Sequence, residues 1–481
     1  MPPRSLLIQA IRPIGSCLLL LATVCSAEMR TTVDDQTAVA VTIYNESLAL
    51  VKDQRELSLP KGRQKLAYRG VSAQMRPETA LFRDFENSDA LQVLEQNFDF
   101  DLLTPQKLLE KYLGRDVRIA TVNPATGKES VQNAKVLSVQ NGTVVRIGDR
   151  IETNPPGRFI FDQLPATLRD EPTLSIELDN NTGGKRAVEL SYLTAGLSWK
   201  ADYVAEISQD DKSLDITGWV TLDNQSGTGY NNAALQLVAG DVNQVASAIE
   251  MRNKHPMVMM ESLAAASTMS EETLFEYHLY SLGRPTNIQD KQTKQVSLMS
   301  AGGVKAIKEL VLQGQNHYYY SRYNQIGQKL KFGVYLQFEN EESNGIGMPL
   351  PKGVVRVYKR DSKGNAQFVG EDNIDHTADK ASVRLKLGNS FDVTANRKQT
   401  DFKILTRVLG KQAFDSSFEI EINNAKKEAV EVIIREPIPS DWEMLRESQP
   451  HVKVSSGIAE WRVQVPAENS KKLSFTARVE H

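Results

Sequence analysis

The chain has 481 residues, 40% of them hydrophobic and 24% charged, which is enough for two to four globular domains and shows no compositional sign of global disorder. Its formal net charge of −3 excludes the strongly basic surface that is typical of nucleic-acid-binding proteins, so we expect no nucleic-acid partner. The chain has two cysteines, Cys17 and Cys25, and both lie within the first 27 residues.

Residues 1–27 have the pattern of a signal peptide. Arg4 and Arg12 precede an apolar run at 17–24, and small residues at 25–27 predict cleavage near Ala27. The apolar run is far shorter than the roughly 20 residues that span a bilayer, so we expect no transmembrane segment after cleavage. The alternative is an uncleaved anchor. We therefore expect an exported protein, periplasmic or extracellular, whose mature chain has no thiol for disulfides, catalysis or metal binding.

The N-terminal third is predicted to contain two β regions. Alternating apolar residues over 36–103 predict an N-terminal β module. Region 104–165 opens with a short helix, for which Thr104 is the expected N-cap, Pro105 the first residue and Gly114 the C-terminal flanking residue. Its expected apolar stripe comprises Leu108, Leu109, Tyr112 and Leu113. Short strands and Asn-Gly turns after the helix predict a small SH3-like barrel.

The rest of the chain is predicted to form two sandwich domains. Residues 172–243 together with 276–400 form the expected central β-sandwich, because 188–192 and 216–222 alternate apolar and polar residues. Similar alternation over 403–481 predicts a C-terminal immunoglobulin-like sandwich. The predicted fold class is mainly β and multi-domain, with immunoglobulin-like β-sandwiches, a small barrel-like β insertion and few short helices.

Residues 244–275 interrupt the strand pattern and hold five of the 11 methionines, so we interpret them as a methionine-rich linker or surface insertion. Thioethers and imidazole are soft or borderline ligands, and their clustering in an exported protein could bind Cu(I). The candidate metal ligands are His255, Met257, Met259 and Met260. The alternative is an adaptable surface for a partner protein.

An aromatic run at 317–323 supplies the candidate binding residues Tyr318, Tyr320 and Arg322. These side chains could stack against sugars or bases. If the run forms a strand, however, alternate rings are buried. We favour this packing role, because the acidic chain lacks the positive field of single-strand binders.

The sequence has no H-E-x-x-H, G-x-S-x-G, P-loop or G-x-G-x-x-G motif. We therefore identify no catalytic residue and expect no cofactor, and a non-enzymatic role is favoured. Paired carboxylates can lie far apart in sequence, so a hydrolase acting on envelope polysaccharide stays an alternative, as does copper handling by the Met/His cluster.

Several phrases of the sequence resemble one family. They are 192–203 with Trp199, 218–224 with Trp219, 237–241, 277–282, 350–358 with Arg356, 370–372 and 387–392. Together they resemble the bacterial exported proteins that carry domain of unknown function 4139, over roughly 188–481. The resemblance implies a multi-domain β-sandwich protein of the cell envelope and implies no activity or catalytic residue. We expect a binding or structural module for an envelope protein or a surface polymer.

Overall fold

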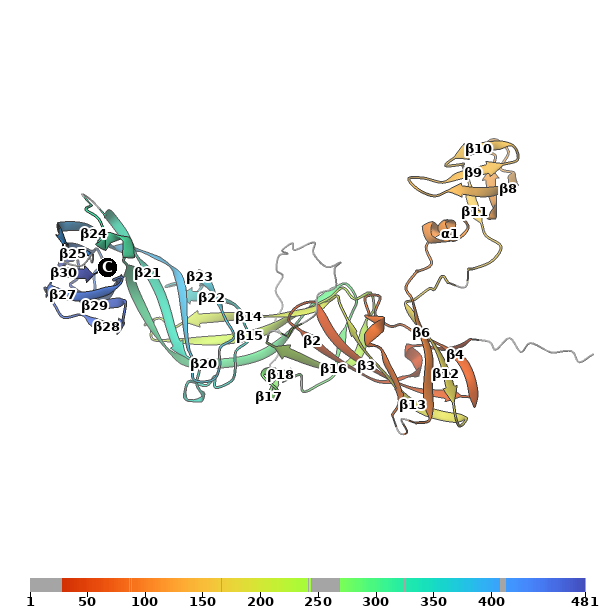
Figure 1. Cartoon of the computed structure of the whole chain (residues 1–481), viewed down its shortest axis with the longest axis horizontal. Coiled ribbons are helices and arrows are strands. Elements are labelled where there is room, and N and C mark those ends of the chain that lie inside the picture. Colours follow the sequence, from red (N-terminus) through yellow and green to blue (C-terminus); the bar gives the residue numbers. More distant parts are fainter. Residues whose placement is uncertain are drawn as a thin grey trace, which may run out of the picture. The chain divides into compact units, whose positions relative to one another are not determined.

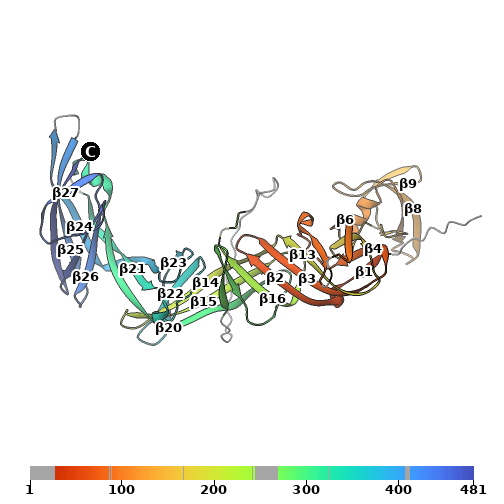
Figure 2. The ribbon, with the colours of Figure 1, turned by 60° about the horizontal axis from the view of Figure 1, so that its bottom comes forward.

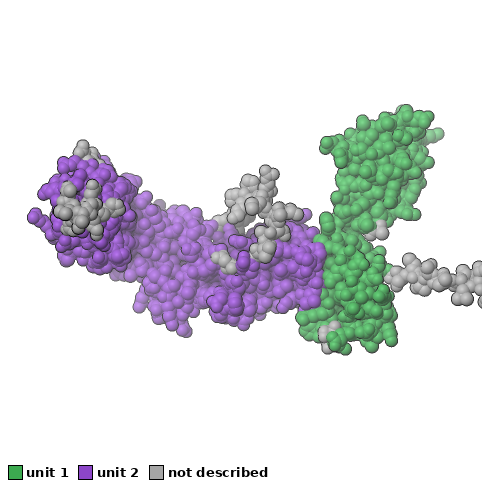
Figure 3. Space-filling model, viewed as in Figure 1, with its two compact units in different colours: residues 1–35, 56–71, 82–188 green, residues 36–55, 72–81, 189–481 purple. Residues whose placement is uncertain are grey.

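The computed structural model describes residues 28–85, 87, 89–165, 167–240, 242–243, 269–323, 326–406 and 412–480. It contains two compact units, coloured separately in Figure 3. Unit 1 comprises residues 1–35, 56–71 and 82–188, and unit 2 comprises 36–55, 72–81 and 189–481. The division falls within β3 (Leu48–Leu59), β5 (Leu81–Asp84) and β13 (Gly184–Thr194), which therefore contribute residues to both units.

The protein is mainly β, as predicted (Figure 1). Within the described ranges it has one α-helix, α1 (Pro105–Lys111), and four short 3-10 helices, η1 (Val33–Asp35), η2 (Pro77–Thr79), η3 (Asn316–Tyr319) and η4 (Glu342–Asn344). The strands form several sheets, and none of the described sheets closes into a barrel. A search of the same ranges for a helix with the length and apolarity of a membrane span finds none.

Unit 1 contains a four-stranded sheet of order β1-β4-β12-β6. Its strands are β1 (Met29–Thr31), β4 (Gly62–Arg69), β12 (Thr173–Asn180) and β6 (Leu91–Asp99). Alternate residues of β12 are buried, because a period of two places every second side chain on the core face.

Unit 1 also contains a five-stranded antiparallel sheet of order β10-β9-β8-β7-β11. Its strands are β7 (Asp116–Val122), β8 (Glu129–Ser138), β9 (Val144–Ile147), β10 (Arg150–Thr153) and β11 (Arg158–Ile160). Helix α1 packs on this sheet through Leu109 and Tyr112. Thr104 caps the helix, as predicted, by accepting the Lys107 N–H at 3.1 Å. Leu113 was wrongly placed in the apolar stripe, since it follows the last helical residues and is 52% exposed.

Unit 2 holds most of an eight-stranded sheet in which seven strands follow the order β17-β18-β16-β2-β3-β13-β5 and β19 pairs with β16. The strands not yet given are β2 (Gln36–Tyr44), β16 (Tyr230–Ala239), β17 (Ser270–Leu274), β18 (Tyr277–Ser281) and β19 (Thr286–Ile288). β17 lies in the region that was expected to be a linker. It ends the sheet, next to β18.

A 13-stranded sheet forms the rest of unit 2, with the order β23-β22-β14-β15-β20-β21-β24-β25-β30-β27 and three further strands, β26, β28 and β29. The first group of strands is β14 (Leu197–Ile207), β15 (Ser213–Asn224), β20 (Gln292–Gln313), β21 (Gly327–Glu339), β22 (Gly353–Arg360), β23 (Ala366–Ile374) and β24 (Ser382–Thr406). The second is β25 (Gln412–Asn424), β26 (Val430–Pro437), β27 (Asp441–Glu447), β28 (Val452–Ser455), β29 (Ile458–Val465) and β30 (Asn469–Glu480).

The long strands β20 and β24 connect the part of this sheet that contains β14, β15, β22 and β23 with the part that contains β25 to β30 (Figures 1 and 2). β20 pairs with β15 over its first two thirds and with β21 and β26 after Lys305. Its last residues, Leu310 and Leu312, join the C-terminal core around Trp461 and Phe418. β24 continues through residue 403, where the C-terminal sandwich was expected to begin. One continuous strand therefore belongs both to the C-terminal core and to the part of the sheet before it.

A buried asparagine ends a strand at two equivalent turns, after β15 and after β25. Asn224 donates from Nδ2 to the carbonyl of Thr228, at 2.9 Å, and to that of Gln289, at 3.0 Å. Asn424 repeats this with the carbonyls of Glu428, at 2.8 Å, and Pro466, at 3.0 Å. In each, Oδ1 accepts an N–H two residues on, at 3.0 Å. The amide satisfies backbone groups that the ending strand leaves unpaired, which is why a polar residue is buried there.

Candidate functional site

The candidate metal ligands His255, Met257, Met259 and Met260 lie outside the described residues. In the part of the chain that the structure does describe, no three histidine, cysteine, aspartate or glutamate side chains gather closely enough to hold a metal ion.

The first residues of the aromatic run, 317–319, lie in the 3-10 helix η3, so the run does not form the strand that was considered for it. Tyr319 is fully buried, and its hydroxyl donates to Glu436 at 2.9 Å. Tyr318 and Tyr320 are half-buried, and the Tyr318 ring lies over the guanidinium of Arg397 at 4.5 Å. The turn is held by side chains far away in sequence, which a local pattern cannot reveal.

The candidate binding residues of this run are engaged inside the chain. Arg322 is exposed, but its Nη2 donates to the Phe402 carbonyl at 3.0 Å. Tyr320 packs its ring against Phe414 at 5.9 Å. Burial raises the pKa of Tyr319 well above its usual range, with Glu436 adding to the effect. These contacts hold Tyr320 and Arg322 against other parts of the chain, while His317 is exposed.

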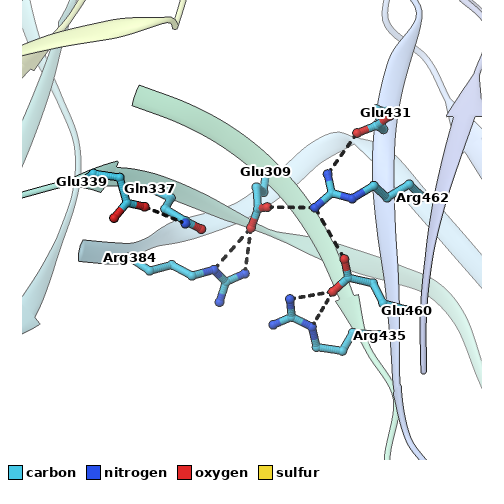
Figure 4. Close-up of polar contacts among 8 residues, drawn as sticks. All are labelled: Glu309, Gln337, Glu339, Arg384, Glu431, Arg435, Glu460 and Arg462. Atoms are coloured by element: carbon cyan, nitrogen blue, oxygen red, sulfur yellow. Dashed lines mark hydrogen bonds and ion pairs between the residues drawn. The ribbon is translucent and has the colours of Figure 1, made fainter. Parts of the chain in front are cut away.

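Six charged side chains form one network of ion pairs (Figure 4). Five alternate in sign along a chain, Arg384, Glu309, Arg462, Glu460 and Arg435, and Glu431 pairs with Arg462 as a branch. Glu309 and Glu460 lie 3.7 and 3.5 Å from the same Nη2 of Arg462. A glycosidase needs two nearby carboxylates with free acid and base roles. Here both carboxylates are held by arginines, so the arrangement ties β20 to β26 and β29.

A shallow hollow of about 190 Å³ lies on β20 and β21. Its lining includes Lys305, Ile307, Gln337 and Glu339, the last two of which Figure 4 also shows. The Ile307 side chain is 62% exposed. An open face of this kind can accept a partner, but its one lysine beside Glu339 and Glu341 does not select one.

The open edge of β17 is a more distinctive feature. β17 pairs with β18 from Ser270 opposite Ser281 to Leu274 opposite Tyr277, with no shift of register. It is the outermost strand of its sheet within the described ranges. In a two-residue hairpin the residues that flank the turn form the hydrogen-bonded pair. We therefore infer that the N–H and C=O groups of Glu271 and Thr273 point to the open edge.

Other outermost strands of five or more residues carry a β-bulge. The residue without a partner is Leu94 in β6, Val369 in β23 and Leu445 in β27. The shorter β28 has one at Val454, and Trp442 donates to the carbonyl of Ser456 beside it at 2.7 Å. Bulges protect sheet edges from pairing with further strands. β17 lacks this protection along its whole length.

The turn that follows β17 is conformationally unusual. Phe275 has φ +59° and is 84% exposed, at a position where hairpins favour glycine or asparagine. Its neighbour Leu274 is 44% exposed. Across the hairpin, Nδ1 of His278 lies 2.8 Å from Oε1 of Glu271. A strained residue that exposes an aromatic ring beside an open edge motivates a functional hypothesis for this hairpin.

Sequence reasoning missed β17 because the segment 270–274 has one strongly apolar residue, Leu274, and no alternation of apolar and polar residues. The available signal was the two-residue spacer 275–276 before the apolar alternation of β18, which is the spacing of a tight hairpin.

The segments that carry the family resemblance pack against one another. Trp199 donates from Nε1 to the carbonyl of Val238 at 3.3 Å, and its ring lies 6.4 Å from that of Tyr280. The hydroxyls of Tyr203 and Tyr280 donate to the carbonyls of Pro351, at 2.8 Å, and Pro349, at 3.0 Å. Aromatic residues of two of these segments thus fix the loop before β22.

These sheets and contacts define a mainly-β protein of several sheets. The chain belongs to the family described as Domain of unknown function (DUF4139), which matches residues 188–481. The match confirms the resemblance and covers the largest continuous part of unit 2. A comparison with curated proteins finds no match.

Proposed function

We propose that this is an exported protein of the cell envelope that acts as a non-enzymatic binding module and engages a partner protein by adding a strand to β17. The observation that carries the proposal is the regular, bulge-free ladder of this outermost strand. An extended partner gains main-chain hydrogen bonds at such an edge, and its alternate side chains provide specificity.

The groups available at the edge belong to Glu271 and Thr273. A partner strand that bonds to these two residues extends the order β17-β18-β16-β2 by one strand. The exposed Leu274 and Phe275 would lie beside the added strand, which would cover part of their apolar surface and remove it from solvent. Main-chain bonds and apolar burial therefore act together at this hairpin.

Export is supported by the signal-like pattern of residues 1–27. Intact-mass analysis of the protein from its native cells should show a chain that starts at Glu28, recovered outside the cytoplasm. A full-length chain recovered with the cytoplasmic fraction would contradict export.

Photo-cross-linking in the native envelope tests the binding role. A photoreactive amino acid placed at Thr273 should form adducts that map to one extended segment of a recurring protein. The matched control is the same amino acid at Phe368, which is 56% exposed on β23, an edge with a bulge. Equal adducts from both positions would contradict the role of β17, and adducts with glycan would identify a surface polymer instead.

A further inference from the structure

The open edge of β17 is acidic. Residues 269–277 contain Glu271, Glu272 and Glu276 and no lysine or arginine. Glu271 already faces His278 at 2.8 Å. In the described part of the chain Glu272 forms no ion pair, and its side chain is exposed. One carboxylate in the middle of the strand is therefore open to a charge on an added strand.

The side chains of β17 alternate between two faces. Glu272 and Leu274 point to one face, and Glu271 and Thr273 point to the other. Directly opposed residues of an antiparallel pair have Cβ atoms roughly 4.5–5.5 Å apart, and this distance applies to the residue that lies opposite Glu272 on an added strand. The position two residues further along the partner then lies opposite Leu274.

A second copy of this chain is a poor occupant of this edge in the two symmetric antiparallel pairings that place one of its glutamates opposite itself. In the symmetric antiparallel pairing centred on Glu272, that residue lies opposite the same residue of the other copy. If the centre of the antiparallel pairing moves by one residue toward Ser270, Glu271 lies opposite Glu271 of the other copy. Like charges directly opposed across strands are destabilising.

We propose that the strand added to β17 comes from a protein segment in which a basic and an apolar residue lie two positions apart, with a lysine or arginine opposite Glu272 and an apolar side chain opposite Leu274. This inference rests on the proposed function, since it names the partner of the same edge. Charge complementarity with the exposed carboxylate selects the basic residue, and the exposed leucine selects the apolar one.

Binding of two synthetic peptides to the full mature chain tests the inference. Both are fluorescent eight-residue strands, one with the repeat Lys-Thr-Val-Thr and the other with the repeat Glu-Thr-Val-Thr, so that the charged residue and the valine lie two positions apart; they are called the Lys/Val and Glu/Val peptides. The Lys/Val peptide should bind, with an affinity that falls as salt is raised. The Glu/Val peptide should bind at least about fivefold more weakly, the ratio that one well-placed charge pair provides.

Matched variants separate the edge from general electrostatic attraction. Glu272→Lys should reverse the preference between the two peptides. Glu443→Lys makes the same charge change on β27, an edge strand with a bulge, and should leave the preference unchanged. Glu272→Gln removes the charge of an exposed side chain and keeps its size, so it tests the same carboxylate if Glu272→Lys disturbs the hairpin.

The outcomes distinguish this inference from the proposed function. Equal binding of both peptides that Thr273→Pro abolishes would overturn the charge preference and leave strand addition standing. Failure of both peptides to bind overturns the inference, and the cross-links from Thr273 then decide the proposed function separately. A concentration-dependent dimer that Thr273→Pro abolishes would overturn it in favour of a second copy.

Discussion

Glu436 accepts two hydrogen bonds from Arg397, both at 2.7 Å, where the side chains are 0% and 1% exposed. Tyr319 adds a third bond at 2.9 Å. Two charges removed from water are stabilising only when their geometry is good and their hydrogen bonds are made. This pair therefore fixes how η3, β24 and β26 pack in the C-terminal core.

Arg397→Met should destabilise the protein by about 3–5 kcal/mol, because it leaves a buried carboxylate unpaired. Urea unfolding followed by tryptophan fluorescence measures the change, since Trp461 lies in the same core. Lys398→Met is the control, because Lys398 pairs with Glu419 at the surface and its loss should cost less than about 1 kcal/mol. Equal costs for the two variants would contradict the role of the buried pair.

Gly314→Ala should also destabilise this core. A Cβ at Gly314 would lie 2.2 Å from Oε2 of Glu436, so the carboxylate would have to move away from Arg397. Gly283→Ala is the control, because a Cβ there meets no atom within 4 Å. Thermal unfolding of the two variants should show a clear loss for Gly314→Ala alone, and matching midpoints would contradict the steric argument.

Asn424→Ala should reduce stability by about 2–3 kcal/mol, since two or three buried hydrogen bonds of roughly 1 kcal/mol each are lost. Asn423→Ala provides the adjacent control, because Asn423 is half-exposed on the other face of β25. Its effect should stay within about 0.5 kcal/mol. If denaturant unfolding gives the same value for both, the hydrogen bonds of Asn424 do not stabilise the turn after β25.

Stability should fall at alkaline pH. Burial raises the pKa of Tyr230 to about 12, although the hydrogen bond with Ser226 opposes this rise. An unfolded tyrosine loses its proton near pH 10, as roughly holds for model peptides. The folded state thus binds the proton more tightly, and the stability gained is complete below about pH 10 and is lost between about pH 10 and 12.

Tyr230→Phe should make the free energy of unfolding fall less steeply than in the unmodified protein over that range. Urea unfolding at pH 8, 10 and 11 measures the two slopes. Identical slopes would mean that the buried tyrosine does not contribute to the loss.

Sequence patterns predicted the strands and the helix start where these depend on neighbouring residues in the chain. Alternation over 216–222 identified a strand because every second side chain there is buried in the core, and Thr104 identified the helix start because its side chain accepts the Lys107 N–H. The turn at Tyr319 could not be predicted locally, because the Tyr319 side chain is held by Glu436, a residue 117 positions away.

The candidate site was largely beyond sequence reasoning. β17 exists because β18 supplies its ladder, and its own residues have little strand character. The bulges that distinguish the other edges depend on register between strands, which no single strand encodes. The acidic character of 271–276 was readable from the sequence, but its position at an open edge was not.

Residue-resolved amide hydrogen exchange across Ser270–Leu274 tests the central claim most directly. In the purified mature protein, the amides of Glu271 and Thr273 should exchange fast and those of Glu272 and Leu274 slowly, because only the latter bond to β18. Addition of the Lys/Val peptide should slow Glu271 and Thr273. Protection of these two amides in the protein alone would contradict strand addition at β17, and no change on addition of the peptide would contradict the charge and apolar pattern that is proposed for the partner.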